Sequence, residues 1–316
     1  MHEFIEDLGC GIYAIDTGFQ RPRFDAAYLM VEEGRAAFID TGTNHAVPRL
    51  LATLAALGLS HLAVDWVIPT HVHLDHAGGA GLLMQALPQA QLLVHPFGLR
   101  HLVDPSALFA GALAVYGAEE MQRSYGELQP VPAERALASH DGMTITLAGR
   151  PLLLLDTPGH ARHHHCLWDA RSRGWFTGDT FGLSYREFDT AAGPWIMPTS
   201  TPVQFDPPAL RASVLRLLSY QPQSMYLTHF GPVGTPDVLA ERLLEMVDAM
   251  VSMSTALPTG PERHAMLKQG LQVQYLQRLQ THGCVLSVAR QLELLAMDIE
   301  LNAQGLGIWL DKRSKL

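Results

Sequence analysis

The sequence has few cysteines, no long apolar run and no excess of basic residues. Its three cysteines, Cys10, Cys166 and Cys284, lie far apart and form no CxxC pair, which excludes a disulfide framework. No apolar run reaches the ~18 residues of a membrane-spanning helix, so no membrane partner is expected. The chain has 22 Lys and Arg against 31 Asp and Glu, and its net charge of -9 disfavours general nucleic-acid binding.

The N-terminus also lacks the pattern of a secretory signal peptide. The segment MHEFIEDLGCG carries acidic residues where a signal peptide has basic residues followed by an apolar core. A chain of 316 residues, 47% of them hydrophobic and 17% charged, can bury a sizeable core in one large domain or two modest ones. These features predict a globular cytoplasmic protein.

Histidine, in contrast, is abundant. The chain has 16 histidines, and 11 of them fall between His71 and His229. Histidine carries protons near pH 7 and is the commonest metal ligand in proteins. The spacing of these residues therefore decides whether they form a site or are scattered over the surface.

The apolar pattern divides the chain near residue 235. Before it, short apolar runs that suit strands alternate with helical patterns, such as residues 46–58, which end at Gly58. This order is typical of an α/β fold. After it come three helical patterns with no strand between them, and Thr235 and Pro236 are expected to cap and begin the first. We predict an α/β domain over residues 1–235 and a helical extension over 236–316 packed on it.

Four residues with ligand side chains stand together where a predicted strand meets a helix. His71, His73, Asp75 and His76 lie within the motif HVHLDH, and in an extended stretch His71 and His73 point to the same side. One carboxylate among three imidazoles suits zinc, manganese or iron better than calcium or magnesium. The motif therefore predicts a metal site.

Three more residues of this kind close predicted strands further along the chain. His160 follows LLLLDTPG, Asp179 follows WFTG, and His229 follows MYLT. Functional groups of α/β folds converge where strands end on one side of a sheet. Together with the first motif, these residues complete a ligand set for two metals.

The motifs THVHLDHAGG, TPGH, FTGDT and LTHFGP, preceded by FIDTG, resemble the five ordered motifs of the metallo-β-lactamase-fold hydrolase superfamily. The resemblance covers roughly residues 10–235. Two further stretches, HPFGLRHLVDPSAL and GHARHHHC, are similar to a little-characterised prokaryotic branch. The resemblance implies an α/β fold of four layers, an αββα sandwich in which two mixed sheets face each other beneath outer helices, so that residues 1–235 are the catalytic domain.

The resemblance also implies a role for each ligand-type residue. It implies two divalent metal ions, with zinc expected first and iron or manganese as alternatives. A carboxylate bridges the two ions, and another acidic residue supports the site from behind without binding metal. The residues that match these roles are His71, His73 and His160 for the first metal, Asp75, His76 and His229 for the second, Asp179 for the bridge and Asp40 for the support.

Three residues are candidates for steps that the metals do not perform. Asp75 is the natural acceptor for the proton of the attacking nucleophile. His163, the first of the three consecutive histidines 163–165, is a candidate proton donor. Tyr185, in the proline-rich segment 182–208, is a candidate for orienting a carbonyl or an anion.

The expected reaction is hydrolysis of an ester-like bond in a small-molecule substrate by metal-bound hydroxide. The pattern THxHxDHxGG is similar to that of glyoxalase-II-like thioesterases, which also carry helices after the body, so a thioester, ester or lactone is favoured. No GxSxG motif suggests a serine nucleophile. The helical extension is expected to wall the mouth of the site or to form a homodimer interface.

Two alternatives stay open. One is a phosphodiester or phosphotriester hydrolase of the same fold. The other is a mononuclear-iron enzyme similar to the persulfide dioxygenases of the superfamily, with iron on His71, His160 and Asp179. That arrangement would leave three ligand-type residues without a role: Asp75, His76 and His229.

Overall fold

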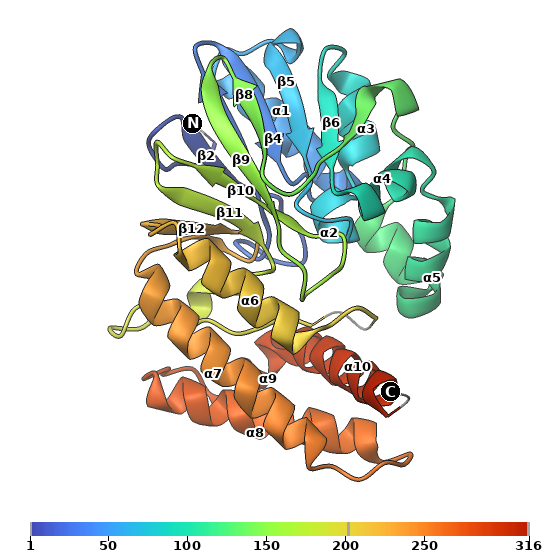
Figure 1. The fold of residues 1–316 in the computed structure, drawn as a ribbon, viewed down its shortest axis with the longest axis vertical. Coiled ribbons are helices and arrows are strands. Elements are labelled where there is room, and N and C mark those ends of the chain that lie inside the picture. The colour runs from blue at the N-terminus through green and yellow to red at the C-terminus, as the bar shows by residue number, and fades with distance from the viewer. Residues whose placement is uncertain (1, 201–202, 315–316) are drawn as a thin grey trace.

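The structure is a computed structural model that describes residues 2–200 and 203–314. Two β-sheets face each other and helices cover their outer faces, so the predicted αββα sandwich is confirmed (Figure 1). A further group of helices lies at one end of the sandwich and includes the C-terminus (Figure 1).

The first sheet has seven strands in the order of the sequence. Neighbouring strands are antiparallel from β1 to β4 and parallel from β4 to β7. The strands are β1 (Ile5–Asp7), β2 (Ile12–Asp16), β3 (Ala26–Glu32), β4 (Arg35–Ile39), β5 (Val64–Ile68), β6 (Gln91–Val94) and β7 (Ala136–Ala138).

The second sheet has six strands in the order β13-β12-β11-β10-β9-β8. Only β11 and β12 pair in parallel among these described strands, because α6 connects them as a crossover. The strands are β8 (Met143–Leu147), β9 (Arg150–Asp156), β10 (His165–Asp169), β11 (Gly174–Gly178), β12 (Ser224–Leu227) and β13 (Gly231–Val233).

Along the chain, helices lie between the strands of both sheets, and the described elements after residue 235 are all helices. Those before residue 235 are α1 (Val47–Ala56), α2 (Leu74–Ala77), α3 (Ala80–Ala86), α4 (Pro96–Val103), α5 (Ser106–Glu120) and α6 (Pro207–Leu218). Those after it are α7 (Pro236–Thr255), α8 (Arg263–Thr281), α9 (Val288–Leu294) and α10 (Ala296–Arg313).

Apolar side chains form a separate core at each contact between layers. Tyr28 and Phe176 lie in the core between the sheets. Leu50 of α1 belongs to the core under the outer face of the first sheet. Val214 of α6 and Leu243 of α7 belong to the core under the outer face of the second sheet. The central strands β3, β4 and β11 therefore carry buried residues on both faces, as expected of the inner layers of a sandwich.

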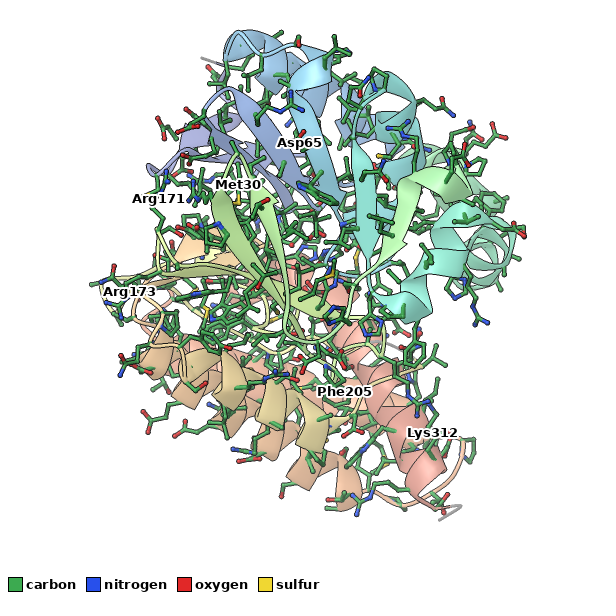
Figure 2. The ribbon with its side chains drawn as sticks, turned by 45° about the horizontal axis from the view of Figure 1, so that its top comes forward. Met30, Asp65, Arg171, Arg173, Phe205 and Lys312 are labelled. Atoms are coloured by element: carbon green, nitrogen blue, oxygen red, sulfur yellow. The ribbon has the colours of Figure 1, made fainter. Side chains whose placement is uncertain are left out.

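A further core holds the C-terminal helices against the segment 183–205. Phe205 of that segment and Leu271 of α8 belong to it. Lys312 of α10 donates a hydrogen bond from its ammonium to the carbonyl of Val203; Phe205 and Lys312 are labelled in Figure 2. Because α7 contributes to this core as well as to the outer layer, the division into 1–235 and 236–316 stays a prediction.

The structure differs from the sequence expectations at two helix ends. The last helical pattern is two helices, since Leu295 has φ −99° and ψ 2° and separates α9 from α10. Thr235 precedes α7 as expected, but it has a left-handed conformation and its side chain makes no capping hydrogen bond. The N1 position of α7 is Pro236, as predicted.

Candidate metal centre

The ligand-type residues converge because each follows the end of a strand. His71 and His73 come after β5, and Asp75 and His76 lie in the short helix α2. His160 follows β9, Asp179 follows β11 and His229 follows β12. The structure therefore brings all seven predicted ligands together, in two groups.

A glycine allows this close approach at the end of β11. Gly178 has φ +47°, and a Cβ atom there would lie 2.4 Å from Oγ1 of Thr70 and 2.7 Å from Nε2 of His164. Those atoms belong to segments beside the ligands His71 and His160. Glycine at this position lets Asp179 enter the site.

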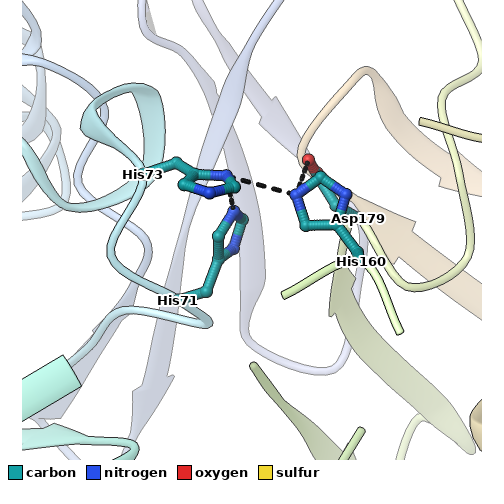
Figure 3. A group of neighbouring side chains, drawn as sticks. All are labelled: His71, His73, His160 and Asp179. Atoms are coloured by element: carbon teal, nitrogen blue, oxygen red, sulfur yellow. Dashed lines mark hydrogen bonds and ion pairs between the residues drawn. The ribbon is translucent and has the colours of Figure 1, made fainter. Parts of the chain in front are cut away.

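The first group contains His71, His73, His160 and Asp179 (Figure 3). Nδ1 of His73 lies 2.7 Å from Nε2 of His71 and 3.2 Å from Nε2 of His160. Nε2 of His160 lies 3.3 Å from Oδ2 of Asp179. Three imidazole nitrogens and a carboxylate oxygen therefore face one point, which matches the donors that zinc prefers.

The second group contains Asp75, His76 and His229. Oδ2 of Asp75 lies 3.3 Å from Nε2 of His229 and 3.8 Å from Nε2 of His76. Oδ1 of Asp179 lies 3.3 Å from Nε2 of His76 and 3.8 Å from Nε2 of His229. Asp179 thus presents one oxygen to each group.

Two buried atoms in this arrangement lack hydrogen-bond partners among the described residues. They are Nε2 of His76 and Oδ1 of Asp179, which face each other at 3.3 Å without the geometry of a hydrogen bond. A buried polar atom without a partner is costly, and a bound cation would satisfy both atoms at once. The donor set and these atoms fit divalent metal ions.

Asp40, which comes directly after β4, lies behind the second group. Its Oδ2 is 2.8 Å from Nδ1 of His76 and accepts a hydrogen bond of 2.7 Å from Oγ1 of Thr228. Its Oδ1 accepts a hydrogen bond of 2.6 Å from the backbone N–H of Thr70. Asp40 therefore contacts His76 and the residues that precede His71 and His229.

Backbone carbonyls hold two more imidazole rings. Nδ1 of His160 donates to the carbonyl of Thr199 at 3.1 Å, and Nδ1 of His229 donates to the carbonyl of Phe24 at 3.1 Å. These contacts fix the tautomer in which Nε2 carries no proton and can act as a ligand. They also place Thr199 and Phe24 within the supporting structure of the site.

The two groups differ in charge. Burial lowers the pKa of His71 and His73 well below the ordinary value, so both rings are neutral at pH 7, the form that binds metal. Burial also opposes protonation of His76, but the carboxylates of Asp179 and Asp40 outweigh it and raise the pKa of His76 well above its usual range. The carboxylates around His76 thus favour a positive charge at this point, which a divalent ion would supply.

The three consecutive histidines after His160 have different surroundings. His163 lines the cavity described below, and its Nδ1 accepts a hydrogen bond of 3.4 Å from the N–H of Val72. His164 is fully buried, and its Nε2 accepts a hydrogen bond of 3.3 Å from the N–H of Asp179. His165 is buried too and donates to the carbonyl of Pro69 at 3.0 Å.

A cavity of about 360 Å³ adjoins both ligand groups. Tyr185 lines it and is otherwise buried, and its hydroxyl donates a hydrogen bond of 3.1 Å to Oδ1 of Asp298 in α10. Burial raises the pKa of Asp298 to about 6. The volume falls within the range of about 300–1,000 Å³ typical of small-molecule sites.

Several residues that support the site are not among those that the motifs predict. Thr70 and Thr228 could have been found, since each precedes a ligand in a Thr-His pair and both bind Asp40. Asp298 and Thr199 carry no such signal, because neither belongs to a motif.

Among the residues that the structure describes, none of the helices has the length and apolar character needed to span a membrane.

Comparison with known proteins agrees with this geometry. The sequence profile of the metallo-β-lactamase superfamily matches residues 21–229. The metallo-β-lactamase fold-containing protein ST1585 of Sulfurisphaera tokodaii is 26% identical over 242 residues, 75% of this chain and 84% of that protein. An atrochrysone carboxyl ACP thioesterase of Aspergillus fumigatus is 27% identical over 173 residues, 54% of this chain and 40% of that protein.

Solved structures show the same fold. The crystal structure of ST1585 from Sulfolobus tokodaii superimposes with a TM-score of 0.66 at 24% identity, over 94% of this chain and 98% of that one. The metallo-β-lactamase family protein TTHA1429 from Thermus thermophilus gives a TM-score of 0.65 at 23% identity, over 92% and 95% of the two chains. With the profile match over most of the sandwich, the chain belongs to the metallo-β-lactamase superfamily of metal-dependent hydrolases.

Proposed function

We propose that this protein is a dinuclear metal-dependent hydrolase that acts on a thioester, ester or lactone of a small molecule in the cytoplasm. The observation that carries the proposal is the pair of ligand groups that share the carboxylate of Asp179. We expect zinc in both positions, with iron or manganese as alternatives.

The ligand assignments follow from the two groups. His71, His73 and His160 would hold one ion, Asp75, His76 and His229 the other, and Asp179 both. Two divalent ions bound there would polarise the scissile carbonyl and lower the pKa of an attacking water. Asp40 would hold the ring of His76 in place through its Nδ1.

Residues of the chain would complete the reaction. Asp75 lines the cavity with its carboxylate a quarter exposed, so it is placed to accept the proton of the nucleophile. Burial lowers the pKa of His163 to about 3, so its ring is neutral at pH 7; because Nδ1 accepts from Val72, the ring proton is on Nε2. His163 lines the same cavity, and this Nε2–H makes it the candidate proton donor to the leaving group. The hydroxyl of Tyr185 already donates a hydrogen bond to the carboxylate of Asp298. Tyr185 would therefore position Asp298 and shape the cavity.

Among the relatives, the Aspergillus fumigatus protein is named as a thioesterase, which supports an ester-like bond. The cavity lining also disfavours a phosphodiester, since none of its described residues is Lys or Arg. A mononuclear-iron oxygenase on His71, His160 and Asp179 is less well supported. It would leave the second group without a metal, and Nε2 of His76 would remain buried without a hydrogen bond.

The first test is the metal content of protein purified without added metal or chelator. We expect close to two equivalents per chain and hydrolysis of at least one thioester, ester or lactone. Asp179→Ala should lose metal and activity together, because both groups lose an oxygen ligand. Asp248→Ala, which removes an exposed carboxylate of α7, should retain both. One equivalent of iron without hydrolysis, or an Asp179→Ala protein with two metals and full turnover, would contradict the proposal.

A further inference from the structure

The cavity beside the ligand groups has an apolar wall that the metal chemistry does not require. Leu108 and Ala112 of α5 lie on it, as do Met297 and Leu301 of α10. Phe19, Phe24, Leu183 and Val203 add further apolar surface. The helical extension therefore contributes directly to the space in which a substrate would sit.

This wall offers no positive charge to a substrate. Among the described residues that line the cavity, none is Lys or Arg. Arg21 packs over the rings of Phe24 and Tyr185, but its Nε donates to Glu187 at 2.7 Å and it does not line the cavity. The charged group contributed by α10 is the carboxyl of Asp298, which is 7% exposed.

We propose that the cavity binds the acyl group of the substrate, and that this acyl group is uncharged and apolar and lies between α5 and α10. The inference rests on the proposed hydrolase function, because it places the scissile carbonyl at the ligand groups and the chain against the apolar wall. An anionic acyl group would lose its hydration without gaining a cationic partner and would face Asp298. An apolar chain would gain free energy with each methylene that it buries.

The first experiment compares thioesters of N-acetylcysteamine, a neutral leaving group, on the metal-loaded protein. From acetyl to octanoyl, we expect kcat/KM to rise by about two- to fourfold for each added methylene. Succinyl and butanoyl groups both have four carbons, but the succinyl group ends in a carboxylate. Succinyl thioester should therefore be cleaved at least about tenfold more slowly than butanoyl thioester, because the cavity offers that carboxylate no cationic partner. Equal rates for acetyl and octanoyl thioesters, or a preference for succinyl, would overturn the inference while leaving the hydrolase proposal intact.

The second experiment measures binding without turnover. The neutral dye N-phenyl-1-naphthylamine should bind the metal-loaded protein and be displaced by octanol. Leu108→Arg and Met297→Arg place a charge in the cavity lining from α5 and from α10, and each should weaken dye binding at least about tenfold. Leu113→Arg is the matched control, because Leu113 lies on α5 but is exposed and does not line the cavity.

The two readouts separate the two proposals. If the protein holds two metals but cleaves no thioester, ester or lactone, the proposed function fails. The apolar site would still be supported if both cavity variants weaken dye binding and the control variant does not. The proposed apolar site would be overturned if dye binding is unchanged in both cavity variants.

Discussion

His163 and Asp179 both reach the cavity, but only Asp179 belongs to a ligand group. We therefore expect His163→Ala to keep its metal content and to lower kcat by about 10²-fold, since a proton donor contributes at about that level. Metal analysis and steady-state kinetics on the same preparation check this. A His163→Ala protein that loses metal, or that turns over at the original rate, would show that His163 is not a proton donor.

The members of the two candidate ligand groups were predictable because each stands in a short motif at a strand end. His73 and His160 lie 87 positions apart in the sequence, yet strand ends in an α/β fold meet on one side, so their contact followed from local patterns. Asp298 could not be predicted in this way. Its place at the cavity depends on how α10 packs against the segment 183–205, and packing between distant segments leaves no periodic trace in a single sequence.

At the scale of elements, a buried amide side chain of α10 is one of the ties between this helix and the segment beside the site. Asn302 is fully buried; its Oδ1 accepts from the N–H of Ser200 at 2.6 Å, and its Nδ2 donates to the carbonyl of Pro198 at 3.2 Å. The same Nδ2 also donates to Oη of Tyr275 in α8 at 2.8 Å. A single residue thus joins two helices and a loop.

We expect Asn302→Ala to lower the free energy of unfolding by about 2–3 kcal/mol, because it leaves buried partners without hydrogen bonds. Urea unfolding measures this. Gln304→Ala, two residues along α10, is the control and should change stability by less than about 0.5 kcal/mol, since its side chain bonds within the same helix to Glu300. Equal effects of the two substitutions would contradict the role given to Asn302.

Element types were more predictable than element ends. The strands and helices before residue 235 follow from apolar periods of two and 3.6 residues. The division between α9 and α10 at Leu295 did not, because the sequence continues with good helix formers through that point. The contacts of each helix with its neighbours decide where the chain bends.

At the scale of the whole molecule, Arg150 forms a buried ion pair with Asp169 inside the second sheet and also reaches the first sheet, at the end away from the proposed metal centre. Arg150 of β9 contacts both oxygens of Asp169, at 2.9 and 2.6 Å, and donates to the carbonyl of Cys10 at 2.6 Å. It also lies 3.3 Å from Glu32 at the end of β3. Both partners of the pair are almost fully buried.

Asp169 also makes stability depend on pH. Burial raises the pKa of Asp169, but hydrogen bonds from Arg150 and Ser172 outweigh burial and hold the pKa below its ordinary value. A carboxyl with a lowered folded-state pKa stabilises the protein above its unfolded-state pKa of about 4, and this contribution is lost as the pH falls further.

We therefore expect Asp169→Asn to cost about 3 kcal/mol at pH 7 and progressively less below pH 4, measured by urea unfolding. Asp248→Asn is the control, because its pair with Arg211 is exposed and should contribute less than about 1 kcal/mol at any pH. A cost for Asp169→Asn that is the same at pH 7 and pH 3 would contradict this account.

The homodimer and the division into residues 1–235 and 236–316 both stay predictions.

The carbonyl of Thr199 has a consequence for how the molecule is assembled. It accepts a hydrogen bond from the ligand His160, and the next residue, Ser200, is held by Asn302 of α10. Thermodynamic linkage is reciprocal, so any free energy that the docked helices contribute to positioning His160 returns as stronger docking once a cation is bound. We therefore expect the C-terminal helices to dock more firmly on the sandwich when a cation occupies the proposed site than when it does not.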